Sequence, residues 1–101
     1  MQKHVIETVT FKLKDGVTVD DFLKAAQPSV DYVKGCKGFI RRRLSGNPGG
    51  QWVETIEWAS MEDAQVASAG FPQIEGNGPF MAAIDESSLA MHHTEVQLSL
   101  N

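Results

Sequence analysis

Alternating apolar and polar positions predict four β-strands along the chain. The clearest alternation is in residues 51–58, QWVETIEW, because successive side chains of a strand point to opposite faces of a sheet. The other expected strands are residues 3–14, 39–44 and 89–100. Trp52, Glu54 and Trp58 therefore share one face of the third strand, and that face is the first place to look for a functional site.

Two stretches have the helical spacing of apolar residues, each preceded by a residue that can cap a helix. Thr18 precedes the first stretch and Ser60 the second, and both are followed by acidic residues where the helix dipole favours negative charge. Pro28 lies inside the first pattern, so we expect that helix to kink or break there. An irregular loop is expected at residues 71–79 and a short helical turn at 80–84.

These elements follow the order β-α-β-β-α-(short α)-β, and two helices cannot cover both faces of a four-stranded antiparallel sheet. The uncovered face must contact water or a partner. It is expected to carry scattered apolar groups and Thr8, Thr10, Val53, Thr55 and Glu57. We expect an α+β fold, a ferredoxin-like sandwich with a four-stranded antiparallel sheet, as one domain over residues 1–101 that forms a homodimer through its sheet faces.

Composition narrows the partners and the compartment. Among 101 residues, nine are basic and 13 acidic, a net charge of −4 that leaves no basic surplus to bind nucleic acid. No window approaches the ~20 apolar residues of a membrane span, and the N-terminus lacks the apolar run of a signal peptide. The lone Cys36 cannot form an internal disulfide. We expect a cytoplasmic protein that binds neither nucleic acid nor a membrane.

One face of the expected sheet gathers two carboxylates and a histidine among apolar residues. Glu7, Glu54 and His92 share this face with Trp52 and Trp58. If helices cover it, burial would raise the pKa of a carboxyl and lower that of a histidine, which makes acid–base chemistry near neutral pH available. An apolar cleft with a few polar groups is typical of small-molecule sites, so Glu7 and both tryptophans are candidate contacts to a substrate.

Two alternatives stay open for these residues. The neighbouring His93 lies on the face opposite to His92, and alternation does not tell which histidine enters the cleft, since one bulge would exchange them. Glu54 could instead pair with Arg42 or His92 in a satisfied polar network. Three consecutive arginines at 41–43 suit an edge strand, where they are solvated or Arg42 turns inward to a buried carboxylate.

Other chemistries find little support in the sequence. His92 and His93 are adjacent on a strand and cannot easily chelate one ion. The expected helices carry no histidine that could serve as a haem ligand, and no G-x-S-x-G motif or dinucleotide-binding fingerprint is present. We expect no cofactor and no metal.

Three segments, GCKGFIRRRL, GQWVETIEWASMEDAQVA and FMAAIDESSLAMHHTEV, resemble the dimeric α/β-barrel superfamily, and within it the antibiotic biosynthesis monooxygenase-like proteins. The likeness rests on Gly38-Phe39, Trp52, Trp58, Ser60, Ala64 and the ending Asp85…Ser88…Met91-x-His93. The start, KHVIETVTFKLKDGV, is also similar to the stress-responsive barrel proteins. The superfamily includes cofactor-free oxygenases acting on aromatic polyketides, haem-degrading enzymes and isomerases, so the fold does not assign the reaction.

The resemblance implies a small homodimeric enzyme, like the cofactor-independent monooxygenases, that acts on an aromatic or polyketide-like molecule. Trp52 and Trp58 would pack against the planar substrate. Glu54, His92 or His93 would take a proton from a phenol or an activated carbon, and the resulting carbanion would react with oxygen directly. The alternative is a non-catalytic dimeric barrel that binds a small apolar ligand.

Overall fold

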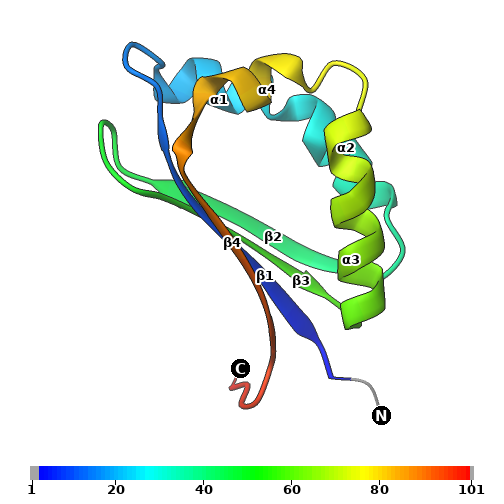
Figure 1. Ribbon diagram of the computed structural model, residues 1–101. Coiled ribbons are helices and arrows are strands. Elements are labelled where there is room, and N and C mark those ends of the chain that lie inside the picture. The colour runs from blue at the N-terminus through cyan, green and yellow to red at the C-terminus, as the bar shows by residue number, and fades with distance from the viewer. Residues whose placement is uncertain (1–2, 101) are drawn as a thin grey trace.

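A computed structural model describes residues 3–100 and places the helices on one face of a four-stranded antiparallel sheet (Figure 1). The strands are β1 (Val5–Leu13), β2 (Phe39–Gly46), β3 (Trp52–Trp58) and β4 (Ile84–Glu95), in the sheet order β2-β3-β1-β4. The helices are α1 (Val19–Ala25), α2 (Gln27–Gly35), α3 (Met61–Gly70) and α4 (Gly78–Ala83), with a 3-10 turn η1 (Phe71–Gln73) before α4. The expected α+β fold with a ferredoxin-like antiparallel sheet is confirmed.

The predicted helix starts are confirmed by their capping bonds. The Thr18 hydroxyl accepts a hydrogen bond from the Asp21 N–H at the start of α1, and Ser60 accepts one from the Asp63 N–H at the start of α3, each at 3.1 Å. The predicted break near Pro28 is also confirmed, because α1 ends at Ala25 and α2 begins at Gln27. A proline ring has no N–H to continue the helical ladder.

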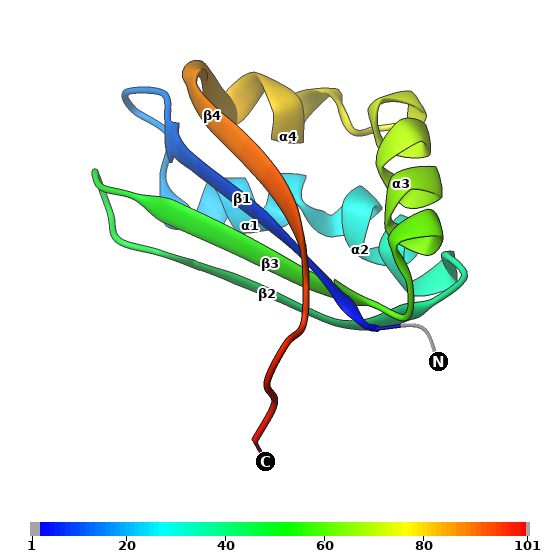
Figure 2. The same cartoon turned by 60° about the horizontal axis from the view of Figure 1, so that its bottom comes forward.

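The end of the chain corrects two boundaries. We expected the last strand at residues 89–100, but β4 begins at Ile84, where it pairs with Leu13, and ends at Glu95, where it pairs with Val5. Pairing with β1 decides both ends, and one further backbone bond, from the Val96 N–H to the His4 carbonyl at 2.8 Å, follows the last strand pair. The expected helical turn at 80–84 is α4, which begins earlier and ends before Ile84. After β4 the chain leaves the sheet as a tail (Figure 2).

Asp85 lies inside β4, just after the end of α4 at Ala83. Its carboxylate accepts hydrogen bonds from the Ser87 N–H at 3.1 Å and the Ser87 hydroxyl at 2.7 Å. These bonds, with help from nearby lysines, lower the pKa of the Asp85 carboxyl. The register with β1 shifts between Thr10 and Lys12, so β4 absorbs an irregular stretch and continues as a strand.

The register of β4 decides which histidine lies under the helices. His93 is opposite Glu7 and therefore shares the helix-covered face with it, whereas His92 is opposite Thr8 on the open face. The prediction that grouped His92 with Glu7 is wrong. Side-chain alternation was correct, but the face depends on a pairing register that no local pattern contains.

β2 is an edge strand, as three consecutive arginines predicted. Arg41 and Arg43 are exposed, whereas Arg42 turns to the covered face opposite Ile56. A register shift lies between Phe39 and Arg41. Of the two interpretations of this segment, the structure therefore has the inward-facing Arg42.

The core lies between the sheet and the helices in two clusters. One surrounds Trp58 and includes Ala64 and Ala67, whose small side chains let α3 approach the sheet closely. The other surrounds Phe11, Phe22, Trp52 and Phe80. Between these clusters the covered face carries its polar residues. No helix in residues 3–100 is long and apolar enough to cross a membrane.

Candidate functional site

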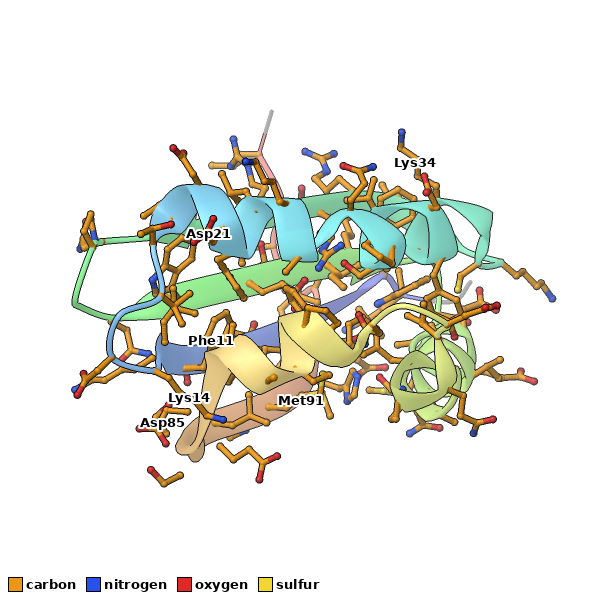
Figure 3. The ribbon with its side chains drawn as sticks, turned by 90° about the horizontal axis from the view of Figure 1, so that it is seen from above. Phe11, Lys14, Asp21, Lys34, Asp85 and Met91 are labelled. Carbon is orange, nitrogen blue, oxygen red and sulfur yellow. The ribbon has the colours of Figure 1, made fainter. Side chains whose placement is uncertain are left out.

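A cleft of about 480 Å³ opens on the covered face between β4 and the helical layer. β1 and β3 provide Glu7, Val9, Phe11 and Glu54. The helical side provides Phe71, Phe80 and Met81, and the neighbouring strand β4 provides Leu89 and Met91. Figure 3 labels two of these lining residues, Phe11 and Met91, in the view from above. The cleft is thus mostly apolar, with three carboxylates, those of Glu7, Glu54 and Glu86, among its lining residues.

Glu54 is buried at the cleft and is held on one side only. Arg42 Nε donates a hydrogen bond of 2.5 Å to Glu54 Oε2, and Arg42 Nη2 makes an ion contact with the same oxygen without hydrogen-bond geometry. Among the described residues, Glu54 Oε1 has no hydrogen-bond partner. Burial raises the pKa of the Glu54 carboxyl, and the nearby Glu7 adds to this, although Arg42 opposes both. The carboxylate is therefore a stronger base than an ordinary glutamate.

Glu7 lies on the neighbouring strand at the centre of a second polar group. Its Oε1 accepts hydrogen bonds from Trp58 Nε1 at 3.2 Å and from the Ser68 hydroxyl at 3.4 Å. His93 Nε2 lies 3.5 Å from the same oxygen and 3.4 Å from the Ser68 hydroxyl. Because Glu7 and Ser68 approach one nitrogen of His93, they do not form the relay in which a carboxylate and a serine use opposite ring nitrogens.

Both tryptophans lie in the core and not in the wall of the cleft. Trp58 is 1% exposed and reaches the site only through its hydrogen bond to Glu7. Trp52 stacks on Phe11, with ring centroids 6.4 Å apart, and meets Phe22 edge-on at 5.2 Å. A planar ligand in the cleft would therefore not touch either indole ring without a change in packing.

The residues that do supply the apolar wall were missed as site candidates. Phe71 and Phe80 flank the proline- and glycine-rich loop, and Met81 follows in α4. Val9 and Phe11 share a face of β1 with Glu7, and Met91 shares a face of β4 with His93, so alternation could have indicated these three. Phe71, Phe80 and Met81 come from a loop and a short helix whose position over the sheet has no periodic signal.

A second hollow of about 490 Å³ lies at the other end of the sheet, beside the β1–α1 loop and the β2–β3 hairpin. Trp52 lines it together with Lys12, Lys14 and Asp85, and Figure 3 shows Lys14 near Asp85. Among the described residues that line it there is no buried carboxylate and no histidine. Of the two cavities, the cleft beside Glu54 is the one with groups suited to acid–base chemistry.

Residues 3–100 contain no group of three His, Cys, Asp or Glu side chains that could hold a metal ion. Among the described residues that line the cleft there is no histidine, cysteine or tyrosine, but Met81 and Met91 line it. Histidine, cysteine, tyrosine and methionine are the side chains that bind haem iron. The two methionine sulfur atoms are therefore the lining groups of a kind that can bind haem iron.

Solved structures of antibiotic biosynthesis monooxygenase-like proteins share this fold. SnoaB, a cofactor-independent oxygenase from Streptomyces nogalater, superposes with a TM-score of 0.78 at 13% identity, over 97% of both chains. The monooxygenase ActVA-Orf6 of Streptomyces coelicolor, solved with nanaomycin D, gives 0.73 at 14% identity, over 98% of this chain and 92% of that one.

A heme-degrading protein of Mycobacterium tuberculosis gives a TM-score of 0.71 at 17% identity, over 100% of this chain and 99% of that one. No family model and no curated protein matches the chain. The predicted resemblance to the antibiotic biosynthesis monooxygenase-like proteins is therefore confirmed for the fold. At these identities the likeness does not extend to a reaction.

Proposed function

We propose that the protein is a cofactor-independent monooxygenase acting on a small aromatic or polyketide-like substrate. The observation that carries the proposal is the buried Glu54 carboxylate, which borders an apolar cleft and has one oxygen without a partner among the described residues. SnoaB and ActVA-Orf6, which are described as oxygenases, have the same fold and support the class of reaction.

In the proposed reaction, Glu54 takes a proton from an acidic phenol or from a methylene carbon activated by neighbouring rings. The electron-rich anion then transfers electrons to molecular oxygen, which is the second substrate. One oxygen atom becomes a carbonyl on the substrate carbon and the other leaves as water, so that the methylene carbon is oxidised and oxygen is reduced. The apolar wall excludes water and favours a planar substrate.

His93 and Glu7 supply a second proton-transfer site in this proposal. They lie on the strands that border the cleft and are in contact with each other, so they can exchange a proton when water leaves the oxygenated intermediate. Glu7 also contacts the substrate from the floor of the cleft. His92, which lies on the opposite face, takes no part, and Trp52 and Trp58 support the floor from within the core.

Oxygen uptake with dithranol, an anthrone with an acidic methylene, tests the proposal after the uncatalysed rate is subtracted. Glu54→Gln keeps the shape of the side chain and removes the base. We expect turnover to fall by roughly 100-fold or more. Glu75→Gln, at an exposed loop position, is the control and should match the wild type. Equal rates for Glu54→Gln and the wild type would reject Glu54 as the base.

A non-catalytic role has its own support, because Glu54 pairs with Arg42 and Glu7 contacts His93. In that case the cleft binds a small apolar ligand and both pairs stabilise the fold. Calorimetric binding of dithranol or its quinone product without any oxygen uptake, with equal affinity in wild type and Glu54→Gln, would identify a binding protein.

The proposed homodimer uses the open face of the sheet. Ile6, Thr8, Val53 and Thr55 are half-buried there, and a second copy would cover them. Thr55→Lys places a charge at the centre of this face and should convert a dimer into a monomer in sedimentation velocity, whereas Gln65→Lys on exposed α3 should not. A wild-type monomer at micromolar concentration would reject the dimer. The cytoplasmic location remains a proposal that rests on the sequence.

A further inference from the structure

Arg42 is the one member of the arginine triplet that enters the covered side of the molecule. Its side chain is 11% exposed, whereas that of Arg41 is 68% exposed. Arginine keeps its charge in proteins, and its planar group carries five N–H donors. A buried arginine therefore requires several acceptors, and the identity of those acceptors shows what it holds.

The acceptors of Arg42 come from two different layers. Among the described residues of the sheet it contacts Oε2 of Glu54, through Nε and Nη2. On the helical side, Arg42 Nη1 donates a hydrogen bond of 2.9 Å to the Ser29 hydroxyl. Ser29 is fully buried and donates in turn to the Ala26 carbonyl at 2.6 Å.

The break between α1 and α2 positions Ser29, the residue on the helical side that contacts Arg42. Ala26 lies between the two helices, and its carbonyl accepts from the backbone N–H of Ser29 at 3.0 Å as well as from the Ser29 hydroxyl. Pro28 fixes the first turn of α2, which places Ser29 directly after it. The Ser29 oxygen is thereby directed at the guanidinium by the backbone of the helix junction.

We propose that Arg42 and Ser29 form a positioning pair that holds one oxygen of Glu54 and leaves the other directed to the cleft. The inference rests on the proposed function in assigning that free oxygen to the substrate proton. Neither residue lines the cleft, so neither touches the substrate. They act through Glu54, by keeping its carboxylate in one orientation.

The charges that face Glu54 come from each strand of the sheet. Arg42 of β2 is the cation, Glu7 of β1 is an anion that raises the pKa of the Glu54 carboxyl, and Glu86 of β4 lines the same cleft. From the helices, Ser68 lines the cleft and Ser29 contacts Arg42, and both are uncharged. Since Arg42 is the cation that opposes burial and Glu7, its loss should raise the pKa of the Glu54 carboxyl further, by about 1–3 pH units.

Carbon-13 NMR of labelled glutamate carboxyl groups in the full-length protein tests the pair without any substrate. The Glu54 signal is assigned as the one that Glu54→Gln removes. We expect Arg42→Met to raise the titration midpoint by about 1–3 pH units, and Ser29→Ala and Arg42→Lys to raise it by less. Arg41→Met, on the same strand but the open face, should leave it unchanged.

Kinetics with dithranol test the positioning role itself. Lysine keeps the charge but cannot reproduce the planar contact, so Arg42→Lys should lower kcat by about 10-fold or more while KM stays within about two-fold. Ser29→Ala should also lower kcat with little change in KM, but the decrease in kcat should be smaller. These two conservative variants decide the question if Arg42→Met does not fold.

The positioning pair and the oxygenase function can be rejected independently of each other. A Glu54 midpoint that is identical in wild type, Ser29→Ala and Arg42→Lys would overturn the positioning pair. A shifted midpoint in a protein that consumes no oxygen would uphold the pair and reject the oxygenase. If the wild type is active, a kcat of Arg42→Lys equal to that of the wild type would also overturn the positioning pair.

Discussion

The two faces of the sheet carry similar charged residues in opposite surroundings. On the covered face Arg42 binds Glu54, with side-chain exposures of 11% and 7%. On the open face Arg41 lies 3.4 Å from Glu57, with 68% of the arginine side chain exposed. The members of each pair lie on the same two strands, β2 and β3. What separates them is the helical layer that covers one face, so burial, and not residue type, distinguishes a candidate site from a surface ion pair.

The histidines show the same difference between the open and the covered face. His4 contacts Glu57 at 2.8 Å on the open face, where half of its side chain is exposed. His93 lies by Glu7 under the helices, with 19% of its side chain exposed. A carboxylate–histidine contact in water is screened and worth little, whereas the same contact at low dielectric can control where a proton resides.

The largest expected effect comes from removing the buried arginine. Arg42→Ala leaves Glu54 without its cation and Ser29 without its donor, and should lower the free energy of unfolding by about 3–5 kcal/mol. Arg41→Ala should cost less than about 1 kcal/mol, because exposed pairs contribute little. Urea denaturation of both variants measures the difference. Similar costs would mean that the helical layer does not distinguish the two faces.

Next in size is the loss of the indole donor to Glu7. Trp58→Phe removes the hydrogen bond to Glu7 and should cost about 1–3 kcal/mol beyond the lost packing. Trp52→Phe is the matched control, since Trp52 is also buried on β3 but has no hydrogen bond from its indole among the described residues. Urea denaturation midpoints of the two variants measure the difference. A larger loss of stability in Trp52→Phe than in Trp58→Phe would contradict the prediction.

The raised pKa of the Glu54 carboxyl should make the free energy of unfolding decrease as the pH rises. Folded Glu54 holds its proton at pH values where the unfolded chain has lost it, so the native state binds more protons and stability falls as pH rises. The fall begins near the ordinary value of 4.5 and ends above the raised pKa, with a slope of at most about 1.4 kcal/mol per pH unit. Glu54→Gln should lose this component and Glu57→Gln should retain it, as measured by urea unfolding at several pH values.

The smallest effect separates the adjacent histidines. His93→Ala removes two long contacts, to Glu7 and Ser68, and should cost about 1 kcal/mol. His92→Ala, one residue away on the exposed open face, should change the free energy of unfolding by less than about 0.5 kcal/mol. Thermal and urea unfolding of this pair give the most local test of the register between β1 and β4.

Several parts of the site could be predicted from local patterns. Period-two alternation placed Glu54, Trp52 and Trp58 on one face of β3, and both helix starts followed from Thr18 and Ser60. The pairing of Glu54 with Arg42 was one of two alternatives. Alternation shows that Arg42 points to the face opposite to that of Arg41 and Arg43, but it does not show which face the helices cover.

Other parts required contacts between distant segments. The choice of His93 over His92 depends on the register of β4 against β1, and a slip of one residue would reverse it. The tryptophans fill the core because helices pack over them, which excludes them from the cleft. Phe71, Phe80 and Met81 reach the wall from a loop and a short helix whose location depends on how α3 and α4 pack.

The sequence by itself determined the strands, the helix caps, the break at Pro28 and the presence of charged residues on both faces, because these follow from spacing and local hydrogen bonding. The tertiary structure alone decided which carboxylates are buried, which histidine accompanies them and which side chains enclose the cleft. Burial and register arise from segments far apart in the chain, and no short-range pattern encodes them.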